Sequence, residues 1–111
     1  MKAFYCHHFV LPLPDGHRFP MSKYALLHAR ILDAAPTLGI ELHEPPAATD
    51  EDLLRVHAPA YVQAMVDGSA DESLMRRIGF PWSPAMVERS RRSSGGTISA
   101  LRSALDGEGV A

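Results

Sequence analysis

The chain has 111 residues, a formal net charge of −2 and a hydrophobic fraction of 46%. This length suits one small domain, and the charge excludes a global positive field that would recruit nucleic acid. No apolar run approaches the roughly 18 residues of a membrane span, so we expect no membrane partner. The single cysteine, Cys6, cannot form an internal disulfide, which favours a cytoplasmic protein.

The amino-terminal part follows a strand–helix–strand pattern. Ala3–Cys6 is a short apolar and aromatic run typical of a buried strand, and the segment from His8 to Pro20 is expected to be a loop. In Ile40–Leu42, apolar residues alternate with a polar one, which predicts a second strand. A helix beginning near Ser22 joins the two, so we expect them to be adjacent and parallel.

Capping residues and helical spacing of apolar residues predict the helices. We expect Ser22 to cap the first helix, and Pro36 with Gly39 to end it. Later boundaries are predicted from a capping box, prolines at first helical positions and glycine stops, at Thr49 with Asp52, Pro59, Gly68, Ser83 with Pro84, and Gly107. Small residues in the middle of the last helix should allow it to pack closely against a neighbour.

Several polar side chains have both a functional and a structural interpretation. Cys6 and His8 would share a strand face and could bridge a metal, but a zinc site needs three or four ligands, so a strand end running into a loop is favoured. His17 lies in a Pro-rich loop and is either a substrate contact or simply exposed. Trp82 lies between two prolines and lines either a pocket or the core.

Two further groups are interpreted as structural. His57 and Tyr61 lie four residues apart and should touch if one helix spans both. Arg89, Arg91 and Arg92 form a small basic cluster, for which a solvated helix face is favoured over a phosphate contact.

The order of four short motifs is more specific than any one of them. The chain contains Gly16-His17-Arg18-Phe19-Pro20, then Leu53-Leu54-Arg55-Val56-His57, then Ile78-Gly79-Phe80-Pro81-Trp82, and finally Ser94-Gly95-Gly96-Thr97. This series resembles the amino-terminal third of bacterial members of the histone deacetylase and acetoin-utilisation superfamily, over nearly the whole chain.

The resemblance implies an α/β fold, namely the amino-terminal part of an arginase/deacetylase-type parallel sheet wrapped by helices, incomplete in this chain. Residues 1–111 would be the amino-terminal portion of a single histone deacetylase-like domain. The implied reaction is zinc-dependent hydrolysis of an acetyl-amide, with acetylated lysine or an acetylated polyamine as substrate.

The family's two Asp and one His zinc ligands, its His-His pair and its Tyr are expected beyond Ala111. The resemblance therefore implies no catalytic residue, no metal ligand and no bound zinc in this chain. His17, Phe19, Pro20 and Trp82 match positions at the rim of the family's substrate channel, and Lys23 matches a basic position of open role. The family's Gly-His-Pro is Gly16-His17-Arg18 here, so the rim is expected to differ locally.

A second hypothesis stays open beside the deacetylase segment. The chain would then be a small, self-contained α/β interaction module without enzyme activity. If the chain is instead a segment, it lacks the later strands of its sheet, and we expect it to be poorly stable or self-associating.

Overall fold

The structure is a computed structural model that describes residues 1–107 and 109–111. Helices make up more than half of the described residues, and two short strands complete the regular structure. The elements in chain order are β1 (Lys2–Phe4), α1 (Lys23–Leu38), β2 (Glu41–His43), α2 (Asp50–Leu54), α3 (Pro59–Asp67), α4 (Glu72–Ile78) and α5 (Pro84–Asp106).

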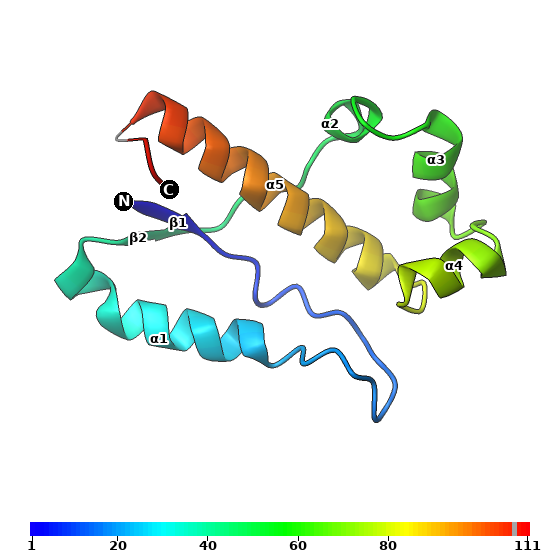
Figure 1. Ribbon diagram of the computed structural model, residues 1–111, viewed down its shortest axis with the longest axis horizontal. Coiled ribbons are helices and arrows are strands. Elements are labelled where there is room, and N and C mark those ends of the chain that lie inside the picture. Colours follow the sequence, from blue (N-terminus) through cyan, green and yellow to red (C-terminus); the bar gives the residue numbers. More distant parts are fainter. Residues whose placement is uncertain (108) are drawn as a thin grey trace.

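β1 and β2 are parallel neighbours, with Ala3 opposite Leu42. Backbone bonds from Glu41 N to Met1 O and from Tyr5 N to His43 O, both 2.9 Å long, flank the paired residues. α1 joins the strands, and Figure 1 shows both strands lying between α1 and α5. The predicted parallel pairing is confirmed. β1 begins one residue earlier and ends two residues earlier than expected, and β2 lies one residue later than expected.

The predicted arginase/deacetylase-type sheet is wrong for this chain. The described residues form only a two-stranded sheet with three residues in each strand. Beyond Pro46, helix-capping residues and helical periodicity continue as far as Asp106, so no later stretch extends the sheet. Val110 and Ala111 add no strand. The fold is therefore small and rich in helix.

The helix boundaries follow local capping chemistry in most places. Thr49 forms the expected capping box with Asp52, and the Ser83 hydroxyl accepts from Met86 N at 3.0 Å. Ser22 occupies the expected N-cap position of α1, but its backbone has helical dihedral angles and its side chain makes no capping bond. Pro36 lies inside the last turn of α1, and Gly39 alone ends that helix in a left-handed conformation.

α5 packs closely against the segment that follows β2. A Cβ atom at Gly95 would collide with the carbonyl oxygen of Pro46, and Ala48 N donates a 2.9 Å bond to Arg91 O. The expected close packing of the small residues in this helix is confirmed.

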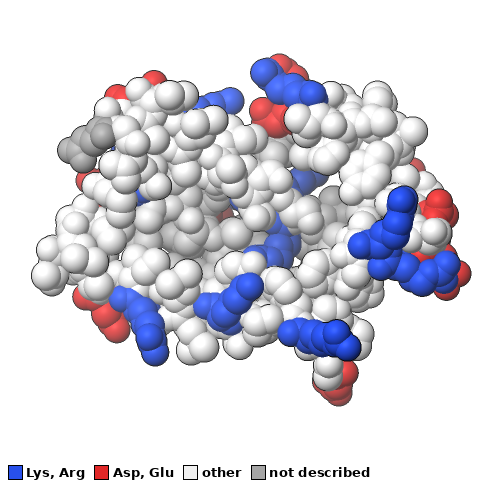
Figure 2. All heavy atoms as spheres, viewed as in Figure 1, with Lys and Arg blue, Asp and Glu red and all other residues white. Residues whose placement is uncertain are grey.

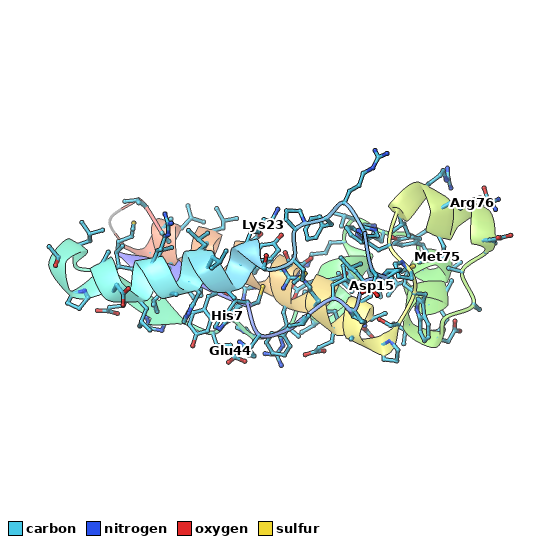
Figure 3. All side chains as sticks on the ribbon, turned by 90° about the horizontal axis from the view of Figure 1, so that it is seen from below. His7, Asp15, Lys23, Glu44, Met75 and Arg76 are labelled. Atoms are coloured by element: carbon cyan, nitrogen blue, oxygen red, sulfur yellow. The ribbon has the colours of Figure 1, made fainter. Side chains whose placement is uncertain are left out.

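The molecule is a thin slab with little core. Its extents are 47 × 35 × 17 Å, and Figure 3 shows the narrow dimension, with the Asp15 loop running between Lys23 at the start of α1 and Met75 and Arg76 on α4. The radius of gyration is 15.8 Å, against about 13 Å for a chain of this length. The side chains that are fully or nearly buried are few: Leu11, Ala35, Pro45, Ala48, Val62, Met86 and Arg89. Across the described residues, every helix falls short of the length and apolarity needed to cross a membrane.

Candidate functional site

The loop before α1 meets the turn between α4 and α5 through His17. Its Nε2 lies 3.2 Å from the carbonyl oxygen of Gly79, and its Nδ1 lies 3.1 Å from Phe19 N. A backbone N–H can only donate, so Nδ1 accepts and the ring proton lies on Nε2, which donates to Gly79 O. Both ring nitrogens are therefore engaged in hydrogen bonds, and neither is available for proton transfer. The neutral ring of His17 links the loop before α1 to the turn between α4 and α5.

Aromatic rings extend this contact. The His17 ring stacks on Phe80 with centroids 5.6 Å apart, and Phe19 meets Phe80 edge to face at 5.2 Å. Lys23 Nζ lies 4.5 Å from the centroid of the Phe19 ring and 5.1 Å from that of Tyr24. Two motifs that are about sixty residues apart in sequence thus form one aromatic cluster, here called the rim cluster: His17, Phe19, Lys23 and Phe80.

A cavity of about 410 Å³ adjoins the rim cluster. Phe19 and Phe80 form part of its apolar wall, and three serine residues of α5 contribute hydroxyl groups. Its lining comprises Leu11, Phe19, Tyr24, Ile78, Phe80, Met86, Arg89, Ser90, Ser93 and Ser94. The lining therefore combines aromatic rings with serine residues, a mixture of apolar and polar groups common in ligand pockets.

Arg89 lies at the base of this site and is 8% exposed. Its Nη1 donates to Cys6 O at 3.0 Å and to Phe9 O at 2.9 Å, and the guanidinium lies 4.2 Å from the Tyr24 ring centroid. Arg91 and Arg92 are half-buried and donate to Ala48 O and Pro45 O. The expected solvated face is therefore wrong, because the three guanidinium groups join α5 to the amino-terminal half.

Of the other two predicted rim residues, Pro20 adjoins the rim cluster through its backbone, whereas Trp82 lies on the α3 side of the molecule. Pro20 is exposed, and its carbonyl accepts from Lys23 N in the turn that leads into α1. The Trp82 indole donates to Met65 O at 2.8 Å and packs on Gly68, both in the α3 region. Trp82 does not line the cavity beside Phe19. At 37% exposure it does not belong to a buried core either, and it packs on the surface of the α3 region.

The histidines near the amino terminus form a second cluster without the geometry of a metal site. His7 stacks on His28 with ring centroids 3.9 Å apart, and His8 pairs with Glu44 at 3.3 Å. Figure 3 shows His7 and Glu44 beside α1. Cys6 Sγ lies 3.8 Å from Arg89 Nη1. No group of three or more potential ligands converges within the described part of the chain, so these residues do not fit zinc.

Burial lowers the pKa of His7 below its usual value, and the nearby His28 and His8 rings lower it further. Its Nδ1 is buried with no hydrogen-bond partner among the described residues. The pKa of Asp52 is lowered mainly by its hydrogen bonds with Thr49.

His57 and Tyr61 touch as expected, with centroids 5.2 Å apart, although His57 precedes the start of α3.

The rim cluster and its cavity bring aromatic rings and the serine residues of α5 together in one place. Sequence reasoning found His17 and Phe19 through the motif that contains them. It missed Arg89 and the role of Phe80, because the partners of both lie more than sixty residues away in the chain.

No protein-family model matches this chain. The chain is similar to an uncharacterized protein of Picosynechococcus sp., with 38% identity over 98 residues. The match covers 88% of this chain and 33% of that relative, so the chain spans about a third of the length of the curated relative it matches.

Proposed function

We propose that this chain is the amino-terminal segment of a zinc-dependent deacetylase that hydrolyses acetylated lysine or an acetylated polyamine. In this proposal the chain holds the outer part of the substrate site, while the zinc ligands and the catalytic residues belong to the rest of the longer protein. No catalytic step is assigned to residues 1–111, whose described side chains do not fit a metal. We propose a cytoplasmic location from the single, unpaired thiol of Cys6.

The observation that carries the proposal is the 3.2 Å contact between His17 Nε2 and Gly79 O. It brings together the Gly16–Pro20 and Ile78–Trp82 motifs, two of the four on which the resemblance rests. The resulting aromatic surface is suited to the methylene stem of a lysine or polyamine, which needs apolar contact along its length. The length of the Picosynechococcus relative leaves room for the catalytic part.

A chimera tests this function directly. The matched region of the Picosynechococcus protein is replaced by this chain, and the product is assayed for zinc content and for hydrolysis of acetyl-lysine peptides and acetylpolyamines. We expect one zinc per chain and measurable deacetylation, whereas the 111-residue chain alone should show neither. A zinc-free chimera, or a chimera without activity on either substrate class, would contradict the proposal.

The rim cluster is tested in the same chimera by Phe19→Ala and Phe80→Ala. Losing one aromatic wall should raise KM for the acetylated substrate about tenfold, with little change in kcat, because the ring binds the substrate equally in the ground and transition states. Leu26→Ala, at an exposed α1 position outside the rim cluster, serves as the control and should leave both constants unchanged. Equal effects of all three substitutions would argue against a role of the rim in binding.

The alternative, a small interaction module without enzyme activity, is favoured by one specific observation. Thirteen large hydrophobic residues in the described part of the chain are exposed, and where such residues form a contiguous patch they mark a site of interaction with another protein. An inactive chimera that nevertheless folds and binds a protein partner would support this alternative.

A further inference from the structure

A second cavity, of about 160 Å³, is lined by residues of α2, α3, α4 and the first half of α5. In Figure 1 these helices meet at the end of the molecule opposite the two strands, and the cavity is here called the helix cavity. We propose that it binds one small, uncharged ring compound that carries a hydroxyl group, with phenol as the simplest representative. Such binding is separate from the deacetylase chemistry of the proposed function.

The walls of the helix cavity are mostly apolar. Val62 of α3 and Met86 of α5 both line it and are only 8% and 4% exposed. The other aliphatic lining residues are Leu53, Met65, Val66, Ile78 and Val87. Water is held weakly between apolar walls, so a ring that displaces it is bound favourably. In Figure 2 mostly uncharged side chains cover the surface over α3, whereas charged side chains gather over α2 and α4.

The volume of the helix cavity indicates the size of the ligand. An apolar cavity of about 150 Å³ holds one benzene molecule, whereas pockets for drug-sized ligands measure about 300–1,000 Å³. A single six-membered ring therefore suits this cavity. His57 and Tyr61 contribute aromatic rings to the lining, with an interplanar angle of 41°. A ligand ring can meet them edge to face, which is a geometry that aromatic pairs prefer.

The charges around the helix cavity favour an uncharged ligand. Arg91 supplies the one Lys, Arg, Asp or Glu side chain in the described lining. Its guanidinium forms an ion pair with Asp50 and donates to Ala48 O at 3.1 Å. An anionic ligand would have to compete with Asp50, and a cationic ligand would find no carboxylate in the lining. Burial of either charge without a partner is unfavourable.

Hydroxyl groups in the lining can bind one polar group of the ligand. The Ser90 hydroxyl is already engaged, because it donates to Met86 O at 2.8 Å. No such bond is found among the described residues for the hydroxyl groups of Tyr61 and Ser94, which also line the cavity. A hydroxyl can both donate and accept a hydrogen bond, so a phenolic group is complementary to these two side chains.

The helix cavity shares a wall with the cavity of about 410 Å³ beside the rim cluster. Ile78, Met86 and two serine residues of α5 line both cavities. Ile78 directly precedes Gly79, whose carbonyl oxygen lies 3.2 Å from His17 Nε2. A ring bound in the helix cavity is therefore adjacent to the segment that joins the two motifs of the rim cluster.

Titration of the 111-residue chain with phenol, followed by NMR of the backbone amides, tests the site. We expect saturable chemical-shift changes at Val62 and Val87 and a dissociation constant of about 1 mM. Phenol should also raise the urea midpoint, because it binds only the folded chain. Benzoate and benzylamine carry the same ring with a negative or a positive charge. These matched ligands should bind at least about tenfold more weakly.

Substitutions that fill the helix cavity provide variants of the protein. Val66→Trp, at a half-exposed position of the lining, should weaken phenol binding about tenfold or more, because the indole takes up the space of the ligand ring. Val10→Trp, the same change at an exposed position outside the lining, is the matched control and should leave the affinity unchanged. Val87→Phe fills the cavity from α5 and serves as a second variant in case the first does not fold.

Three outcomes would overturn the proposed site. The first is the absence of saturable phenol binding by the parent chain. The second is binding of benzoate or benzylamine as tight as that of phenol, which would contradict an uncharged ligand. The third is an affinity for phenol that a folded filling variant leaves unchanged. If neither filling variant folds, chemical-shift changes confined to residues outside the lining would have the same meaning.

Discussion

At the scale of single residues, neighbouring glycines of α5 have different roles. Gly95 is buried against the backbone of the segment after β2, where a Cβ atom would collide with Pro46 O. At Gly96 the nearest atom to an added Cβ is a side-chain carbon of Pro45 at 3.6 Å, which is ordinary van der Waals contact. Close packing therefore requires glycine at the first position of the Gly-Gly pair. At the second position the structure has room for a larger side chain.

This difference gives a matched pair of substitutions. Gly95→Ala should lower the free energy of unfolding by about 1–3 kcal/mol, because the backbone has to move to accept the methyl group. Gly96→Ala should be neutral or stabilising by up to about 1 kcal/mol, through better helix propensity. Urea unfolding followed by circular dichroism measures both, and equal effects at the two positions would show that α5 does not approach Pro46 closely.

The lowered pKa of His7 predicts an acid sensitivity. Between the folded-state pKa and about pH 6.5, the unfolded chain binds more protons at His7 than the folded chain does. The contribution of His7 to the free energy of unfolding is therefore fully present above about pH 6.5. It falls as the pH decreases through that value and levels off below the folded-state pKa. The lowered pKa of the Asp52 carboxyl acts only in a more acidic range, nearer pH 4.

The urea midpoint should therefore drop between pH 7.5 and pH 5.5, and His7→Gln should reduce that drop. His57→Gln, at an exposed position, provides the comparison and should keep the full pH dependence. A His7→Gln variant as acid-sensitive as the parent chain would rule out His7 as the cause.

At the scale of the elements, helix α5 is held at its start by the Ser83 side chain and α1 has no such cap. Ser83→Ala should cost about 1 kcal/mol of stability, since it leaves the Met86 amide without its 3.0 Å acceptor. Ser22→Ala should change stability by a few tenths of a kcal/mol at most. Thermal unfolding of the two variants distinguishes them, and a Ser22→Ala effect as large as that of Ser83→Ala would contradict the assigned cap.

Local chemistry explains which elements the sequence predicts well. The starts at Thr49 and Ser83 and the stop at Gly68 depend on bonds or conformations within a few residues, so they can be found without the fold. The same holds for the strand–helix–strand pattern around α1. Ser22 shows where such local prediction fails. Its side chain could form a capping bond, but the preceding turn continues into α1, so the backbone of Ser22 takes helical dihedral angles and no capping bond forms.

Long-range partners explain what the sequence did not reveal. Arg89 bonds to residues eighty or more positions away, and nothing near it in the sequence distinguishes it from a solvated arginine. The placement of Trp82 on α3 depends on the close approach of its ring to Gly68, which ends α3 and lies fourteen positions earlier in the chain. The resemblance found the rim residues His17 and Phe19, but it also suggested a larger sheet than the two short strands present.

At the scale of the whole molecule, the slab lacks the buried core of an independent domain. Leu27, Leu101 and Leu105 are all more than half exposed, and each such side chain forfeits about 1.5–3 kcal/mol of burial. A small domain has only about 5–15 kcal/mol of total stability. The isolated chain should therefore bind a hydrophobic dye, melt over a broad range below about 60 °C and tend to self-associate.

Calorimetry, dye binding and light scattering together check this expectation. A strict monomer with a sharp, cooperative melt above about 60 °C would contradict it. Such a result would also favour the self-contained module over the segment of a larger protein.

The buried guanidinium of Arg89 has a consequence for the order in which the protein is made. It donates to Cys6 O and Phe9 O, so these two residues gain their bonds only after residue 89 has been added. At roughly 5–20 residues per second, a nascent chain waits about 4–18 seconds for that residue. Throughout that interval the carbonyl groups of Cys6 and Phe9 lack their Arg89 donor and remain free to bond with water.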